Sequence, residues 1–333
     1  MTTGKGRVPG QLMSVEVASE YIRSGRVMCI AGDERALRKL PRGRWIGGTI
    51  CYFISADGGV TSQDEVFVDL LPADCGEPKL RFYDVSTISK LCIDGPDNGF
   101  SLVVMPAFAP IHLQFAQHAP NYEDMYMKPL VGWVAGVHMS ELGTLTPKAV
   151  FGPTGEFSEL NAVAIHVPLP ETRSASVAIV NLFQPGEGAV IRFPRSGFNA
   201  SDVLIDNQPH NLARYLSESG INIQLPLVAD YCGAHINVAI RAADAQKGEV
   251  DFYGPVFEGV DYRFANPVSS YADAFREMAP KEAVPAAFSC NCILNYLYGN
   301  LEGHSTGTLY GPVTFGEIAY QLVNQTLVYL RVD

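Results

Sequence analysis

The C-terminal segment of the chain holds the side chains best suited to chemistry. Two thiols separated by one residue, Cys290 and Cys292, end an apolar run, and a glycine-glutamate pair follows at Glu317. An amide and hydroxyl cluster, Asn324-Gln-Thr326, precedes the last strand-like run. Thiols can act as nucleophiles, redox groups or metal ligands, whereas a carboxylate and amides can orient a bound molecule. We therefore expect a polar pocket at the edge of an otherwise apolar sheet.

The two thiols admit a structural interpretation beside the chemical one. Their spacing differs from the two-residue spacing of zinc and thioredoxin-type pairs, so no metal or cofactor is predicted. Cys290 would then be a small buried residue at a strand end. Residues two apart on a strand share a face, however, so Cys290 and Cys292 could still line one wall of a site.

The remaining candidates are a histidine, an ion pair and several neutral groups. His304 lies in a glycine-flanked loop and could be a general base, a ligand contact or an exposed residue. Glu317 alternates with apolar residues, which predicts a buried carboxylate that either pairs with Arg241 or holds a ligand ammonium group. Neutral hydrogen-bonding groups that suit ligand contacts as well as turns and caps are Asn295, Tyr310 and Asn324.

The composition predicts a globular protein with no nucleic-acid partner. The 333 residues exceed the size at which single cores stop growing, and 47% hydrophobic against 18% charged residues can fill two cores. The formal net charge is -11, and phosphate binding needs a basic stripe. The densest basic segment, residues 35–44, is predicted to be the solvated face of a helix and its following loop.

The sequence also predicts a cytoplasmic protein with no membrane insertion. It contains no apolar run of about 18 residues, and residues 1–11 are polar and glycine-rich, unlike a secretory signal. The seven cysteines are odd in number and scattered through apolar runs, where a free thiol behaves as a small hydrophobe. A reducing compartment fits this pattern.

Secondary-structure signals in the first half alternate between helices and strands. Ser14 can cap a helix over 15–24, and Asp33 can cap a short helix that follows a strand. Residues 45–54 read as one long strand with a glycine pair, and 65–71 as its hairpin partner. A strand buried on both faces at 100–105 precedes a helix that starts at Pro110.

The second half continues the mixture and completes the predicted architecture. We expect a hairpin of 176–183 with 189–193, helices at 209–220 and 271–278, and a buried strand at 286–289 followed by a helix. A proline-rich segment before residue 172 predicts two lobes, 1–172 and 173–333. The predicted fold class is mixed α/β (α+β), with mostly antiparallel or mixed sheets packed as helix-sheet-sheet-helix layers.

Short motifs of the second half occur in a recognisable order, and this order resembles the C-terminal part of a FIST domain (F-box and intracellular signal transduction). More faintly, Ile46-Gly-Gly-Thr-Ile50 and Leu130-Val-Gly-Trp-Val134 resemble its N-terminal part. The motifs of the second half are Asp206-Asn-Gln-Pro-His210, Leu225-Pro-Leu227, Ala239-Ile-Arg241, Gly248-Glu-Val-Asp-Phe252, Phe288-Ser-Cys290, Phe315-Gly-Glu317 and Asn324-Gln-Thr326.

The resemblance implies an intracellular sensory domain that binds a small ligand, such as an amino acid, and acts through a separate signalling protein. Family members commonly carry an arginine and a glycine soon after the strand-end cysteine, whereas this chain has Cys290-Asn-Cys292-Ile-Leu. The alternative is a thiol-dependent hydrolase or transferase that uses Cys290 or Cys292 with His304. The first function is favoured because phosphate-loop, nucleotide, nucleophile-elbow and zinc-protease motifs are all missing from the sequence.

Overall fold

The computed structural model describes residues 10–231, 234–280 and 286–333. It confirms the predicted fold class, because six short α-helices in this part of the chain accompany sheets whose strand pairs are mostly antiparallel. Cys232 lies outside the described residues.

The body is built from one structural unit that occurs three times. Each unit contributes an edge strand, a central strand, a helix, a strand parallel to the central one, a hairpin and a returning antiparallel strand. The first comprises β1 (Gln11–Ser14), β2 (Met28–Gly32), α2 (Glu34–Leu37), β3 (Trp45–Thr49), β4 (Tyr52–Ser55), β5 (Gly58–Thr61) and β6 (Glu65–Leu70), with the extra helix α1 (Val15–Arg23) after β1.

The other two units repeat this order. The second comprises β7 (Lys79–Tyr83), β8 (Gly99–Pro106), α3 (Pro110–His118), β9 (Leu130–Ala135), β10 (Ala149–Phe151), β11 (Glu156–Ser158) and β12 (Ala162–Pro168). The third comprises β13 (Ala175–Val180), β23 (Phe288–Cys292), α6 (Ile293–Tyr298), β24 (Gly311–Thr314), β25 (Glu317–Ala319), β26 (Gln321–Val323) and β27 (Leu327–Val332).

The units are interlocked because each hairpin joins the sheet of another unit. The hairpin β4-β5 extends the third unit's sheet, β10-β11 extends the first, and β25-β26 extends the second. The resulting strand orders are β1-β6-β2-β3-β10-β11, β7-β12-β8-β9-β25-β26 and β13-β27-β23-β24-β4-β5. Each of these sheets is therefore completed only when a distant part of the chain folds.

A glycine recurs at one position of this unit. A side chain at Gly47 on β3 would meet the Ile30 carbonyl oxygen at 2.1 Å, and one at Gly132 on β9 would meet that of Val103 at 2.0 Å. At Gly311 on β24 the Ser289 carbonyl oxygen would lie at 1.9 Å. Close approach of backbone therefore requires glycine, in all three units, on the strand that runs parallel to the central one.

The inner faces of the three sheets share one core, and helices cover the outer faces. Cys29, Val104 and Cys290 belong to this core together with the two large side chains of Phe67 and Trp133. Outside, α1 and α2 pack on the first sheet, α3 on the second and α6 on the third. Any two sheets thus form helix-sheet-sheet-helix layers, arranged around a common centre.

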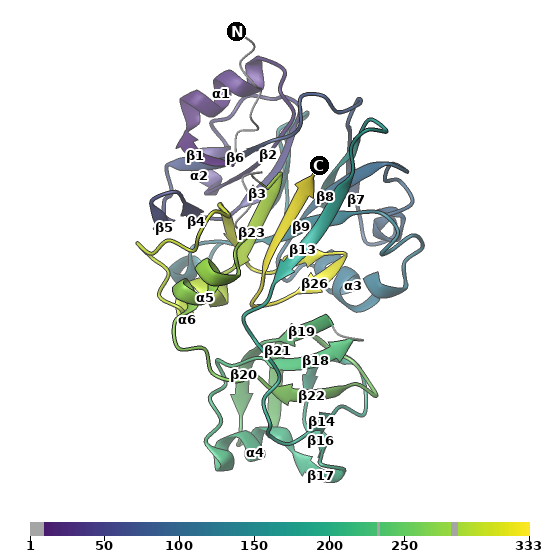
Figure 1. Cartoon of the computed structure of the whole chain (residues 1–333), viewed down its shortest axis with the longest axis vertical. Helices are drawn as coiled ribbons and strands as arrows, with labels where there is room; N and C mark the ends of the chain where they lie inside the picture. Colours follow the sequence, from purple (N-terminus) through teal and green to yellow (C-terminus); the bar gives the residue numbers. More distant parts are fainter. Residues whose placement is uncertain (1–9, 232–233, 281–285) are drawn as a thin grey trace.

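A β-rich lobe is inserted between β13 and β23, in the place that α1 occupies in the first unit. It contains α4 (Leu212–Ser219) and two sheets around a core of its own, and it hangs below the body in Figure 1. Its strands are β14 (Ile191–Arg192), β15 (Gly197–Ala200), β16 (Asp202–Ile205), β17 (Gln208–Asn211), β18 (Leu227–Tyr231), β19 (Ala234–Val238), β20 (Ile240–Asp244), β21 (Glu249–Val256) and β22 (Asp261–Phe264). The chain then returns through α5 (Tyr271–Met278), which packs on the body.

The expected division near residue 172 does not separate these sheets. Strands from both sides of that position pair in the second and third sheets, as β9 with β25 and β4 with β24 show. The proline-rich segment instead connects the second and third units. Local composition looks the same for such a connecting segment as for a boundary between two independent cores.

Local signals predicted helix ends well and strand partners badly. Ser14 and Asp33 cap their helices, and Gly220 ends α4 in the left-handed conformation at φ 62°.

The predicted single strand 45–54 is wrong, because β3 and β4 lie in different sheets. The two predicted hairpins are also wrong: β6 pairs with β1 and β2, and β13 pairs with β27. Residues 208–211 form β17, and α4 begins after its Asn211 cap.

Candidate functional site

Four of the predicted site residues meet in a closed polar cluster where β23, β25 and β27 approach one another. The Glu317 Oε2 atom accepts hydrogen bonds from the Thr326 hydroxyl at 2.9 Å and the Thr326 backbone N–H at 3.2 Å. Asn295 Nδ2 donates to Asn291 Oδ1 at 3.0 Å, and the Cys292 N–H donates to the Thr326 carbonyl at 3.2 Å. Cys290 is the fourth predicted residue of this group, and its electrostatic neighbours include Glu317 and Cys292.

Burial controls the ionisation of this cluster. Glu317 is completely buried, which raises the pKa of its carboxyl to about 8 even though hydrogen bonds from Thr326 oppose the rise. Burial also raises the pKa of both thiols well above the usual value, and the nearby Glu317 carboxylate adds to the rise. The cluster holds protonated groups in a closed interior and offers no thiolate.

Several polar atoms of this cluster lack a hydrogen-bond partner among the described residues. They are Glu317 Oε1, Asn291 Nδ2 and Asn295 Oδ1. Each belongs to a side chain that is no more than 3% exposed. A protonated Glu317 reduces the cost of such burial, because a neutral carboxyl group loses less hydration than a carboxylate.

The predicted Asn324-Gln-Thr326 segment connects this cluster with the inserted lobe. Asn237 of β19 donates from Nδ2 to the carbonyls of Asn324 at 3.1 Å and Gln325 at 3.3 Å. Its amide also exchanges two hydrogen bonds, each of 2.9 Å, with Asn181 at the entry to the lobe. Asn237 is 2% exposed, so these bonds fasten the lobe to the body in a dry environment.

Asn237→Ala should therefore loosen the lobe. The variant leaves buried carbonyls without donors, which costs roughly 2–3 kcal/mol of unfolding free energy. Hydrogen exchange should accelerate in β18, β19 and the 324–326 turn, whereas Asn222→Ala, which alters an exposed turn of the lobe, should leave that exchange unchanged. Equal exchange in both variants would show that Asn237 does not hold the lobe.

Arg241 lies apart from Glu317, in a cavity at the junction of the body and the lobe. Its guanidinium pairs with Asp251 at 2.9 Å, so Glu317 is not its partner as the sequence suggested. The two side chains are 48% and 39% exposed and stand at the mouth of a cavity of about 140 Å³. The lobe lines it with Phe198, Asn199, Arg241, Asp251, Phe252 and Tyr253, and the body with Ala107, Phe108, His112, Leu113 and Phe315.

His112 is the polar group that the body contributes to this junction cavity. Its Nδ1 atom accepts the backbone N–H of Phe108 at 3.2 Å, so the proton of the neutral ring resides on Nε2. That Nε2 has no partner among the described residues, although the side chain is only 4% exposed. Burial lowers the pKa of His112 to about 4, so the ring is neutral at physiological pH.

The backbone beside His112 adds to the same side of the cavity. α3 begins there with Pro110, and its N-cap residue Ala109 provides no side-chain hydrogen bond. Phe108 adopts φ 63°, a strained conformation for a non-glycine residue, and its ring packs edge-to-face on Phe315. The cavity thus combines an aromatic wall with an ion pair at its mouth.

Two predicted residues lie elsewhere. His304 is exposed and its Nδ1 donates to the Glu302 carbonyl at 2.9 Å within the same loop, whereas Cys290 and Cys292 are 1% and 2% exposed. Tyr310 borders an open groove of about 640 Å³ between the edge strand β1 and the hairpin β4-β5. These positions do not favour a reaction between His304 and either thiol.

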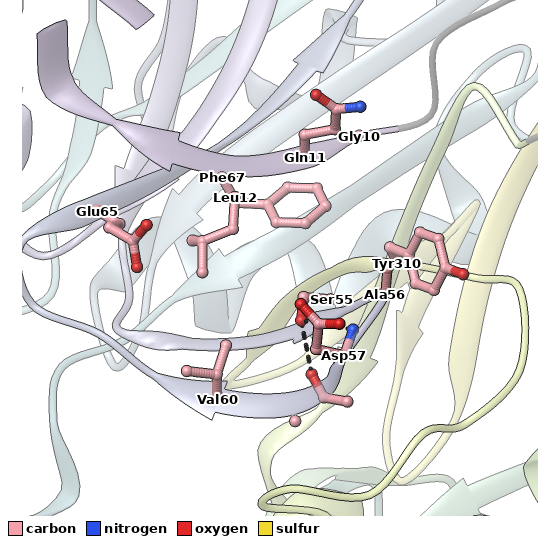
Figure 2. Close-up of a pocket in the computed structure, with 12 residues that line it drawn as sticks. Gly10, Gln11, Leu12, Ser55, Ala56, Asp57, Val60, Glu65, Phe67 and Tyr310 are labelled. Atoms are coloured by element: carbon pink, nitrogen blue, oxygen red, sulfur yellow. Dashed lines mark hydrogen bonds between the residues drawn. The ribbon is translucent and has the colours of Figure 1, made fainter. Parts of the chain in front are cut away.

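Figure 2 shows this open groove, with Leu12 and Phe67 in its floor and Tyr310 at one side. Ser55 Oγ donates to the Gly58 carbonyl at 3.0 Å and so shapes the hairpin turn. The groove carries the carboxylates of Asp57 and Glu65, and none of the described residues that line it is basic. The junction cavity is the better candidate site because it combines both charges with an aromatic wall.

A second buried histidine, His166, belongs to a chain of hydrogen bonds on the outer side of the second sheet. Tyr83 donates to Asp94 at 2.8 Å and therefore accepts from His166 Nε2 at 2.7 Å. His166 Nδ1 then accepts from the Ser101 hydroxyl at 2.8 Å. Burial lowers the pKa of His166 to about 4. Both ring nitrogens of His166 have hydrogen-bond partners within the protein. We assign it a structural role.

Acidic side chains pair with the basic segment 35–44. Within the basic segment 35–44, Arg35 pairs with Asp33, Arg38 with Glu34 and Arg44 with Glu77. No group of three or more His, Cys, Asp and Glu side chains in the described residues could hold a metal ion. The helices of the described chain are too short or too polar to span a membrane.

The fold is therefore α+β, with a three-sheet body, an inserted β lobe and a small cavity where the two meet. The chain belongs to a family of unknown function, DUF6976, whose model matches residues 13–333. A search of curated proteins found no match. The family model covers the body and the lobe, so the residues on both sides of the junction cavity lie within the matched region.

Proposed function

We propose that the protein is a cytoplasmic sensory domain that binds a small ligand in the junction cavity. The observation that carries this proposal is the composition of the cavity, in which the Arg241–Asp251 pair of the lobe faces the aromatic wall of the body. Ligand sites commonly lie at domain interfaces and combine apolar walls with a few polar groups. Neighbouring positive and negative charges suit an amino acid or a related metabolite.

A ligand at this junction would couple binding to the position of the lobe. The lobe is fastened to the body on one side by the Asn237 network and borders the cavity through β15, β20 and β21. A molecule that contacts both parts favours one arrangement of them over others. A separate signalling protein could then distinguish the bound from the free state, as the resemblance to FIST domains implies.

The thiol-dependent hydrolase or transferase is the less favoured function. It requires a thiolate near a base, whereas burial raises the pKa of Cys290 and Cys292. His304 hydrogen-bonds within an exposed loop and is not part of the closed cluster. Both thiols are therefore assigned to the core of the body.

Ligand-dependent stabilisation tests the proposed function. A panel of amino acids, organic acids and amines should include compounds that raise the melting temperature by several degrees without turnover, since a ligand at 100 times its Kd stabilises a protein by about 2.7 kcal/mol. Leu113→Trp should fill the cavity from its rim and abolish the shift. Leu160→Trp, at another exposed leucine, is the matched control. A panel without any shift in the unmodified protein would contradict the proposal.

A further inference from the structure

The open groove of Figure 2 is a second concave site, separate from the junction cavity. Its volume of about 640 Å³ lies within the range of about 300–1,000 Å³ that is typical of binding sites. None of the residues that line it also lines the junction cavity. It lies between β1, the edge strand of the first sheet, and the hairpin β4-β5 at one edge of the third sheet. The body therefore has a recess that the proposed small ligand does not use.

The hairpin that forms one wall of the groove is held in place from behind. The Gly59 N–H donates to the His304 carbonyl at 3.1 Å, and the Gly59 carbonyl accepts the Gly303 N–H at 2.8 Å. The Thr61 hydroxyl donates to the Glu302 carboxylate at 2.9 Å. Because these bonds position the hairpin before anything binds, less conformational entropy is lost on binding.

Two carboxylates give the groove a negative potential. Asp57 lies in the turn of the hairpin, and Glu65 is the first residue of β6, on the opposite wall in Figure 2. The described residues supply no ion pair to either carboxylate, and no basic residue among them lines the groove. The formal net charge of -11 adds to the same potential. A positively charged partner is therefore complementary to the groove.

Apolar side chains in the groove limit the kind of cation that fits. Leu12, Val60 and Tyr310 are half-buried and line it between the two carboxylates. A small cation would leave these side chains in contact with water, whereas apolar groups of a larger partner would cover them. A second copy of the chain would bring its own net charge of -11 and be repelled. A peptide segment with both basic and apolar side chains matches both features.

We propose that this groove is the docking site of a partner protein that inserts an extended basic segment. Lysine or arginine side chains of the segment pair with Asp57 and Glu65, and a leucine or valine side chain between them packs on Leu12 and Val60. Because the carboxylates lie in an open groove, salt should screen these ion pairs and weaken the complex. The proposal does not depend on a ligand in the junction cavity.

Fluorescence anisotropy of the full chain with an array of labelled hexapeptides tests this inference. Each peptide carries leucine at two positions and lysine, norleucine or glutamate at two others, so matched members differ only in charge. We expect the lysine peptides that bind best to bind about tenfold more tightly than their norleucine and glutamate counterparts at about 50 mM salt. The difference should shrink to about threefold or less at about 500 mM salt.

Variants of the groove assign this preference to particular residues. Asp57→Asn combined with Glu65→Gln removes both charges with little change in shape and should abolish the preference for lysine. Glu187→Gln combined with Asp202→Asn removes two exposed carboxylates outside the groove and should preserve it. Val60→Thr keeps the shape of the wall but adds a hydroxyl group, and it should weaken the binding of every leucine-containing peptide severalfold.

The inference is overturned if lysine, norleucine and glutamate peptides bind equally or if no member of the array binds. An unchanged lysine preference in the Asp57→Asn, Glu65→Gln protein would also overturn it. If spermidine binds as tightly as the best peptide, the groove takes a small cation instead of a protein segment. If the chain sediments as a dimer that Val60→Arg dissociates, a second copy occupies the groove. The comparison of lysine with norleucine in the unmodified protein decides the charge requirement even if a variant does not fold.

Discussion

Glu317→Gln should stabilise the protein at pH 8 by about 3–5 kcal/mol relative to the unmodified chain, the largest effect that we expect from a single substitution. The folded carboxyl has a pKa of about 8 because it is completely buried, against an ordinary value of 4.5. Glutamine has nearly the same shape, accepts the Thr326 N–H and carries no charge at any pH. It therefore removes the cost of ionising a buried group.

The sign of the pH dependence follows from proton uptake. Between pH 4.5 and 8 the folded state holds a proton on Glu317 that the unfolded state has lost, so unfolding releases it. The contribution of Glu317 to stability is complete below about pH 4.5, declines as the pH rises and is lost once the pH passes about 8. The advantage of Glu317→Gln should grow across the same window.

Denaturant unfolding at several pH values measures this effect. Glu187→Gln, which removes an exposed carboxylate, is the control and should follow the unmodified protein. His112 and His166 act in the opposite direction at acid pH: their folded pKa of about 4 lies below 6.5, so stability present above pH 6.5 is lost as the pH falls toward 4. If the unfolding free energy of Glu317→Gln changes with pH in parallel with that of the unmodified chain, Glu317 does not have a raised pKa in the folded state.

Gly132→Ala is expected to have the second-largest effect, a loss of about 3 kcal/mol of stability. The new methyl group would lie 2.0 Å from the Val103 carbonyl oxygen. This oxygen belongs to the central strand of the sheet, so relief requires the two strands β8 and β9 to separate. Both strands are buried along their length, and neither can move without disturbing the common core.

Thermal unfolding of Gly132→Ala beside Gly188→Ala tests this steric argument. Gly188 has open space around the position of an added methyl group, so its substitution should change stability by no more than about 0.5 kcal/mol. Gly47→Ala should behave like Gly132→Ala, because its methyl group would meet the Ile30 carbonyl oxygen at 2.1 Å. Near-normal stability of both core variants would disprove the requirement for glycine in the repeated unit.

Sequence reasoning succeeded where the determining interactions are local. Ser14 and Asp33 sit directly before their helices, and an N-cap side chain bonds within three residues. The burial of Glu317 followed from strand alternation, which also depends on neighbours in the chain. The order of the C-terminal strands correctly brought Glu317, Thr326 and the two cysteines together, but they form a closed buried cluster and not the expected pocket.

The larger architecture depends on partners that no local pattern specifies. The chain passes from one sheet to another between Thr49 and Tyr52 while its apolar character continues, so residues 45–54 look like a single strand. The pairing of β4 with β24 joins residues more than half the chain apart. Gly47, Gly132 and Gly311 are present in the sequence, but only the structure shows that they occupy the same position in the three units.

The junction cavity was only partly foreseeable. Arg241 was predicted as a ligand contact, but its partner Asp251 lies ten positions away on the neighbouring strand, and the sequence favoured Glu317 instead. His112 was missed because a histidine in an apolar helix looks like an ordinary core residue. Its place in the first turn after Pro110, directly behind a buried strand, is the local signal that could have identified it.

A crystal structure of the chain with the tightest-binding compound of the panel tests the central claim most directly. We expect electron density for that compound in the junction cavity, in contact with both Phe315 of the body and residues of the lobe. Density in another place, with only water in the junction cavity at saturating ligand concentration, would contradict it.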